Sequence, residues 1–387
     1  MTGDILPWLP DRHLGVVSTL AHADELIAQV GDLLFDYMTQ PNGVIELKEV
    51  VRGAYSETTV VGLAPIARKI PLLAADALVA LRAAIEHTLF AEAEFLSGTA
   101  LDEKAARSIE MPAALSYDKY AEWVRNRQRY APAAMAKGSE LLRRVEGLQP
   151  FHRNIRPELH PMARLALHTN HAKHRTPAVT AVRLVTIVRD DEIPLSRHNV
   201  RLEPEVPLRV GDVIARTPLG QHVPVALFPT VGANRPGTDQ WPILMHELAE
   251  LASWVREQAV PRLVTGEDPP PERIPARYEI TVAHANEREA IARGSLITAA
   301  ERTKVRLGAM SARGSLIELL LPLSAELTRS GLESWLESVS DHEVVEWASQ
   351  LKESLIEGPA GTQAVIDRLV DDAARHLGSG PVSSETA

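Results

Sequence analysis

Residues 71–95 read PLLAADALVALRAAIEHTLFAEAEF, and this stretch decides the fold. Proline favours the first turn of a helix, so a helix is expected to begin at Pro71. Its apolar residues do not keep to one stripe, which is typical of a helix at the centre of a bundle. Arg82, Glu86 and His87 interrupt the apolar run, which is therefore too polar for a membrane span of ~18–20 apolar residues. These three polar side chains need partners if they are buried.

Periodicity predicts the elements on either side of this helix. Residues 22–38 show helical spacing, and residues 44–52 and 56–64 are predicted to form a hairpin across Gly53. After the central helix we expect a helix pair within 114–146, a loop at 150–161, a helix at 161–175, strands at 178–189, 206–217 and 222–231, and a helix at 242–264.

The predicted fold class is α+β: a helical bundle with a central buried helix, a small β-rich portion and a mostly helical C-terminal appendage. Asp268-Pro-Pro-Pro271 is the clearest linker. The expected divisions are 1–177 (bundle with the hairpin), 178–266 (β-rich portion with a capping helix), 273–378 (mostly helical) and 379–387 (disordered tail). Within the third division we expect a strand at 277–283 and helices near 287–305, 315–330, 341–357 and 361–377.

Composition narrows the class of protein. The 387 residues include 45% hydrophobic residues and no cysteine, so a large core is available, whereas disulfides and thiolate metal sites are excluded. The first residues lack the basic and apolar regions of a signal peptide. These features predict a cytoplasmic protein with no membrane partner.

Charge is uneven along the chain, whose net charge is −10. The segment from Lys119 to Arg175 holds twelve Lys or Arg and four Glu, a local charge of +8 that leaves −18 for the rest. Within it, residues 117–130 (YDKYAEWVRNRQRY) interleave aromatic residues with arginines, the combination that often holds single-stranded nucleic acid. The alternative is an amphipathic helix with its arginines in solvent. The pattern favours RNA as a partner.

Arg82, Glu86 and His87 have a structural and a functional interpretation. Arg82 and Glu86 are spaced i, i+4 and can pair with each other, while His87 can bond to a backbone carbonyl. Alternatively, Arg82 binds a phosphate and His87 is a general acid or base. Five positions place Arg82 and His87 about 140° apart on a helix. They would therefore converge only across a cleft or a second subunit.

Arg82 and His87, with four residues between them, resemble the signature of HEPN-type domains. The resemblance implies a metal-independent endoribonuclease active as a homodimer, without a cofactor, in a toxin or phage-defence setting. Arg82 would stabilise the phosphate, His87 would act in proton transfer and Glu86 would orient nearby groups. HEPN motifs favour a polar residue just after the arginine, where this chain has Ala83.

A broader resemblance covers residues 20–265. The landmarks here are Leu81-Arg82-Ala-Ala-Ile-Glu-His87, then Gln149-Pro-Phe-His152, then Asn170-His-Ala-Lys-His-Arg175. They are similar in order and spacing to a family of uncharacterised bacterial proteins with LRxALDH and NxDKHR landmarks. Ala172 and Glu86 replace two aspartates of that family. We expect Lys173, His174, Arg175, Asn170 and His152 to bind or orient RNA.

Residues 168–175 also have other interpretations. His168, His171 and His174 recur every three residues, and imidazole is a common metal ligand. No carboxylate lies at ligand spacing, however, so no metal is expected. A solvated cluster is one alternative, and pairing of Lys173–Arg175 with Asp76 and Glu86 is another. The competing function is therefore a non-catalytic interaction or scaffold protein, in which the same residues form a structural polar network and the C-terminal region binds a protein.

Overall fold

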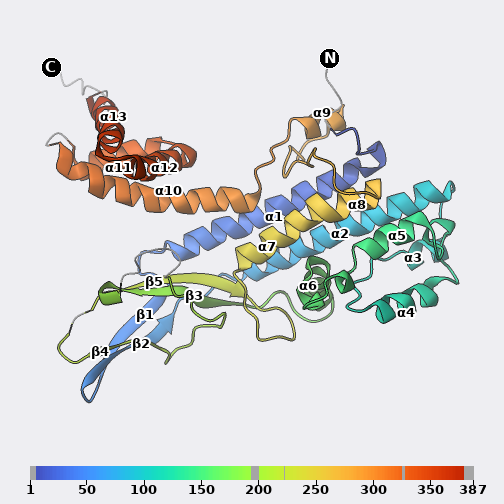
Figure 1. Cartoon of the computed structure of the whole chain (residues 1–387), viewed down its shortest axis with the longest axis horizontal. Coiled ribbons are helices and arrows are strands. Elements are labelled where there is room, and N and C mark those ends of the chain that lie inside the picture. The colour runs from blue at the N-terminus through green and yellow to red at the C-terminus, as the bar shows by residue number, and fades with distance from the viewer. Residues whose placement is uncertain (1–5, 193–199, 222, 325–326, 379–387) are drawn as a thin grey trace, which may run out of the picture. The chain divides into compact units, whose positions relative to one another are not determined.

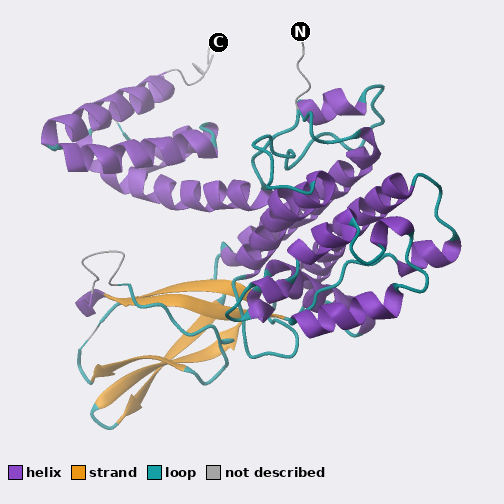
Figure 2. Cartoon of the chain, turned by 45° about the vertical axis from the view of Figure 1, so that its right-hand side comes forward, coloured by secondary structure: helices purple, strands orange, loops and turns teal. Residues whose placement is uncertain are grey.

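A computed structural model of the protein describes residues 6–192, 200–221, 223–324 and 327–378. Helices dominate, and the strands form small antiparallel sheets (Figure 2), so the α+β class is confirmed. Contacts divide the chain into two compact units, Met1–Ala300 and Glu301–Ala387. Each unit has its own hydrophobic core.

The first unit begins with a long helix and a hairpin. Helix α1 (Leu14–Met38) starts eight residues before the expected position, because the preceding turn already buries Val16, Val17 and Leu20. Strands β1 (Ile45–Arg52) and β2 (Tyr55–Leu63) pair antiparallel, which confirms the predicted hairpin. Gly53 makes the turn with φ of 62°, a conformation that favours glycine.

Helix α2 (Lys69–Ser97) is the centre of the first unit. It packs against α1 and against helices that follow later in the chain, and Leu81, Ile85 and Leu89 have no exposed surface. Figure 1 shows α1, α2 and α7 side by side, with the strands near one end of these helices. The expected buried central helix is present.

Four shorter helices lie on the side of α2 that faces away from α1 (Figure 1). Asp102, Ser116, Ser139 and His160 each cap the N-terminus of one of them by accepting a hydrogen bond from a backbone N–H. The helices are α3 (Glu103–Ser108), α4 (Tyr117–Arg127), α5 (Glu140–Gly147) and α6 (Pro161–His174).

The later strands do not form one sheet. β3 (Thr180–Arg189) pairs with β5 (Val225–Ala233), whereas β4 (Val213–Pro218) pairs with β2 of the N-terminal hairpin. The described strands therefore form the sheets β1-β2-β4 and β3-β5. This pairing joins residues on both sides of the expected division at 178, so the two parts belong to one unit.

The expected helix at 242–264 is present as α7 (Leu244–Trp254), a π-helical segment (Val255–Ala259) and α8 (Val260–Thr265). The linker after Asp268 leads back to the first helices: the Trp8 indole donates to the Glu272 carbonyl, 2.9 Å away, and the Ser18 and Tyr278 hydroxyls lie 2.6 Å apart. The first unit therefore extends beyond the expected division at 273.

The strand expected at 277–283 is absent from this described segment, in which Arg277 makes only an isolated bridge to Ser295. Helix α9 (Glu287–Ala292) is shorter than the helix expected there. The chain folds back at this point, so the backbone of Ala276 and Arg277 bonds to the backbone of Ser295 instead of to a neighbouring strand.

The second unit is helical. Leu332, Trp335 and Leu336 are central to its core, in which the Trp335 and Trp347 rings stack at 5.3 Å. Its helices are α10 (Ala299–Leu320), α11 (Arg329–Ser338), α12 (Asp341–Glu357) and α13 (Pro359–Gly378). Among the described residues, no helix is long and apolar enough to cross a membrane. The tail expected at 379–387 lies outside them.

Candidate functional site

Arg82 and Glu86 form a pair on α2 that holds a distant backbone segment. Arg82 is only 8% exposed, and its Nη2 lies 2.6 Å from Oε1 of Glu86. The same guanidinium donates to the carbonyl of Met111, and the other Glu86 oxygen accepts the Met111 N–H at 2.9 Å. Burial raises the pKa of Glu86, and the charge of Arg82 and the Met111 N–H partly offset that rise. Together the two side chains bind both polar groups of one residue between α3 and α4.

His87 lies apart from this pair. Its side chain is exposed whereas Arg82 is buried, as expected for positions about 140° apart on a helix. Arg82 instead faces α6, where its Nη1 lies 3.8 Å from Sδ of Met162. In a single copy of the chain, Arg82 therefore points into the protein and His87 points into solvent.

The segment after His168 is mostly exposed. Asn170, Lys173, His174 and Arg175 are in solvent at the C-terminal end of α6. Among the described residues, the pairing of Lys173–Arg175 with Glu86 is not formed, because Glu86 binds Arg82 and Met111 instead. His152 is exposed as well, with its Nε2 2.9 Å from the Glu146 carbonyl.

His168 belongs to a buried ionic network that the sequence analysis did not predict. Its Nε2 lies 3.2 Å from Oε1 of Glu247, which is 2% exposed. Arg164 donates to Glu247 at 2.8 Å, and Arg235 donates to both oxygens at 3.0 and 2.7 Å. Burial alone would raise the pKa of Glu247, but the bonds from His168 and Arg235 and the charge of Arg164 lower it to about 2.

A signal for this network was present in the sequence. Glu247 lies three residues after Leu244 and four before Leu251, both fully buried, so it stands on the apolar stripe of its own helix. Glu92 is a second example on α2: it binds Arg12 and His13, at 2.7 and 2.6 Å. A carboxylate at a stripe position indicates a buried cationic partner.

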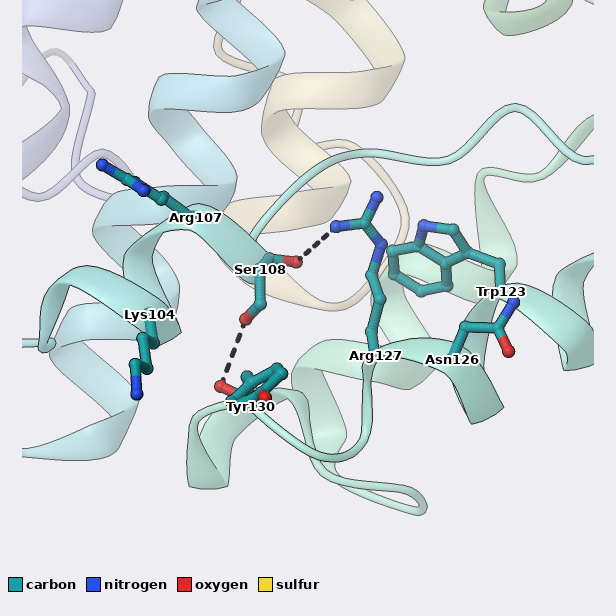
Figure 3. A pocket seen from close by; sticks show the side chains of 7 residues that line it. All are labelled: Lys104, Arg107, Ser108, Trp123, Asn126, Arg127 and Tyr130. Carbon is teal, nitrogen blue, oxygen red and sulfur yellow. Dashed lines mark hydrogen bonds between the residues drawn. The ribbon is translucent and has the colours of Figure 1, made fainter.

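Residues 117–130, the segment that interleaves aromatic residues with arginines, form one wall of a cleft between α3 and α4 (Figure 3). The cleft, here called the α3–α4 cleft, has a volume of about 470 Å³. Its described lining comprises Lys104, Arg107, Ser108, Trp123, Asn126, Arg127 and Tyr130.

Hydrogen bonds across the base hold the α3–α4 cleft together. Arg127 donates to the Ser108 carbonyl at 3.1 Å, and the Ser108 hydroxyl donates to the Tyr130 carbonyl at 3.3 Å (Figure 3). The Arg127 guanidinium lies 5.4 Å from the Trp123 ring, within the range of a cation–π contact. Tyr130 is 46% exposed, and the Arg129 guanidinium lies 5.2 Å from the centroid of its ring.

Cations line the α3–α4 cleft, and two of them are paired with carboxylates just outside it. The described lining contains three cations and no carboxylate. Arg107 and Arg127 pair with Glu103 and Glu110, which stand outside the lining. Lys104 is exposed and has no ion-pair partner among the described residues. Lysine and arginine beside an open aromatic ring can bind phosphates while the ring stacks on a base.

Comparisons with known proteins add no relative, since no family model, curated protein or solved structure matches the chain. Among the described residues, no group of three or more His, Asp or Glu side chains is placed to hold a metal ion.

Proposed function

We propose that the protein binds single-stranded nucleic acid in the α3–α4 cleft. The observation that supports this proposal is the partly exposed Tyr130 ring beside Lys104, a cation with no ion-pair partner among the described residues. The wall of the cleft that carries Tyr130 belongs to the segment of local charge +8, and the wall that carries Lys104 precedes that segment. A local positive field of this kind attracts a polyanion in spite of the overall charge of −10.

The proposed roles follow from the exposure of each side chain. Tyr130 would stack on a base, because its ring is exposed and every base has a π-face. Lys104 and Arg107 would bind phosphates, because both side chains are exposed at the cleft. Arg127 already contacts Trp123 and the Ser108 carbonyl, so it would hold the cleft in shape.

Fluorescence anisotropy with a short labelled oligouridine tests the proposal. We expect Tyr130→Ala to weaken binding about tenfold, the loss of one stacked base. The matched control is Tyr117→Ala, which removes a tyrosine that is 60% exposed, compared with 46% for Tyr130, from the start of α4 and outside the cleft lining. Equal binding by wild type and Tyr130→Ala, or no binding by wild type, would contradict the proposal. A deoxyuridine oligonucleotide of the same length shows whether the 2′-hydroxyl contributes.

Salt dependence tests the phosphate contacts separately. With two contacts, raising salt from about 50 to about 200 mM should weaken binding about sevenfold. Lys104→Ala should lower the slope of log affinity against log salt by about 0.7. Arg143→Ala removes an exposed cation of the same basic segment from α5, outside the cleft lining, and should leave the slope unchanged.

A second candidate is the metal-independent endoribonuclease expected from Arg82 and His87. Arg82 is buried and faces α6 whereas His87 is exposed, so this candidate requires a second subunit to bring both side chains to one substrate. His87 is exposed and accessible to a substrate. Labelled RNA incubated in EDTA should be cleaved by wild type and left intact by His87→Ala. Equal cleavage by both proteins, or none by either, would remove this candidate.

A further inference from the structure

A second cleft lies between the start of α6 and the helix formed by α7 and the π-helical segment. This α6–α7 cleft has a volume of about 620 Å³, within the usual range for small-molecule sites. It shares no described lining residue with the α3–α4 cleft. Its described lining comprises Arg153, Leu159, Pro161, Arg164, Arg235, Glu250, Ser253, Trp254, Glu257 and Gln258.

The charges at this cleft do not balance inside the protein. Arg164 and Arg235 both line it, and both donate to the same buried carboxylate of Glu247. Two guanidinium groups thus share one buried negative charge. Buried charges require compensation, so a second anion is needed at this point.

Glu250 supplies that second anion from the solvent side. Its side chain is 62% exposed, whereas that of Arg164 is 7% exposed. One Glu250 oxygen lies 2.6 Å from Nη1 of Arg164, the same nitrogen that donates to Glu247. The buried Nε of Arg164 has no hydrogen-bond partner among the described residues. The pairing with Glu250 therefore leaves part of the guanidinium unused.

The remaining charges favour an anion at the same place. Arg153 is exposed and donates to the carbonyls of Ile155 and Leu159. It has no carboxylate partner among the described residues. Glu257 lies 3.7 Å from Arg273, which offsets its charge. Without Glu250, the described lining has a positive surplus centred on Arg164, Arg235 and Arg153.

We propose that the α6–α7 cleft binds a small organic oxyanion, a carboxylate or a phosphate monoester, which replaces Glu250 on Arg164. A carboxylate or phosphate matches the fork of donors on a guanidinium better than a single shared oxygen does. The organic part of the ligand would pack against Trp254 and Leu159. Glu250 is then a competitor within the protein that occupies the site when the ligand is absent.

Isothermal titration calorimetry of the full chain with phenyl phosphate and with benzoate tests this proposal at constant ionic strength. The two probes share an aromatic body and differ in the anion. Glu250→Gln removes the competing charge and keeps the side-chain volume, so we expect it to bind at least one probe about tenfold more tightly than wild type. Arg153→Gln should weaken binding about tenfold, since it removes an exposed cation from the cleft.

Glu289→Gln is the matched control for Glu250→Gln. Glu289 is 54% exposed, close to the 62% of Glu250, and it pairs with Arg293 at 2.5 Å outside the cleft. The two changes therefore remove a glutamate charge of similar exposure, one at the cleft and one away from it. Its affinity should equal that of wild type. Failure of Glu250→Gln to bind either probe more tightly, or an equal gain in Glu289→Gln, would overturn the proposal. The outcome does not depend on nucleic-acid binding at the other cleft.

Discussion

Arg82, which the sequence suggested as a catalytic residue, has a structural role in the folded protein. Its guanidinium binds Glu86 one turn away and the carbonyl of Met111, while Glu86 binds the Met111 N–H. The i, i+4 pairing was predictable, because both residues lie on the same helix. The bond to Met111 was not, because nothing in the periodicity of α2 indicates which loop packs beside it.

Arg82→Ala should therefore lower the free energy of unfolding by about 3 kcal/mol, because it leaves the partly buried Glu86 without its cation. Arg82→Ala/Glu86→Gln should recover part of this loss, since the glutamine keeps an acceptor for the Met111 N–H without the charge. His87→Ala, a change at an exposed position, should stay within about 0.5 kcal/mol of wild type. Urea unfolding measures all three. A loss from Arg82→Ala no larger than that from His87→Ala would show that the tether to Met111 does not stabilise the fold.

His160 makes stability depend on pH. Its Nδ1 accepts the Met162 N–H at 3.1 Å and caps α6. Burial and the positive charges of Arg153 and Arg164 lower its pKa from 6.5 to about 4. Between these values the unfolded chain takes up a proton that the folded chain does not, so stability falls as the pH drops from 6.5 to 4 and the full contribution is present above pH 6.5.

His160→Asn should reduce this decline, because asparagine is a good N-cap and does not titrate. Its stability should remain near that of wild type above pH 6.5 and exceed it near pH 4. His160→Ala should lose about 1 kcal/mol at neutral pH as well, since the cap itself is removed. Urea unfolding across this pH range provides the measurement. An identical pH profile for His160→Asn and wild type would rule out the proposed titration.

At the scale of elements, helices and hairpins with local causes were predictable and strand partners were not. The hairpin across Gly53 follows from alternation and a glycine turn. The pairing of β4 with β2 joins residues such as Arg216 and Glu57, which are far apart in the sequence. Alternation indicates where a strand can form, but it does not show whether a sheet edge is available to it, and the strand expected at 277–283 is absent from the described structure.

Gly53→Ala should lower the free energy of unfolding by about 1 kcal/mol. The residue has φ of 62°, and no atom lies within 4 Å of an added Cβ, so backbone strain is the only cost. Gly15→Ala meets equally open space in α1, where φ is that of a helix, and should stabilise by about 0.5 kcal/mol. Thermal unfolding of both variants tests the pair, and a change of the same sign in both would refute the role of the turn.

For the whole molecule, two separate cores predict two unfolding transitions. Leu332 is fully buried in the second unit and Leu165 in the first. Each Leu→Ala change should destabilise its own unit by about 2–5 kcal/mol. In differential scanning calorimetry, Leu332→Ala should lower one transition and Leu165→Ala the other. A single transition that both variants shift would contradict this independence.

The α+β class, the buried α2 helix and the N-terminal hairpin were determined by the sequence alone, because each depends on residues within a few turns of one another. The tertiary structure decided which charges meet. Arg164 and Glu247 are 83 residues apart, and His168 and Glu247 are 79 apart. Helical periodicity shows which face of a helix is buried, but the partner of that face is set by packing between helices. The α6–α7 cleft, which is lined by residues 153–164 and 235–258, was therefore visible only in the folded chain.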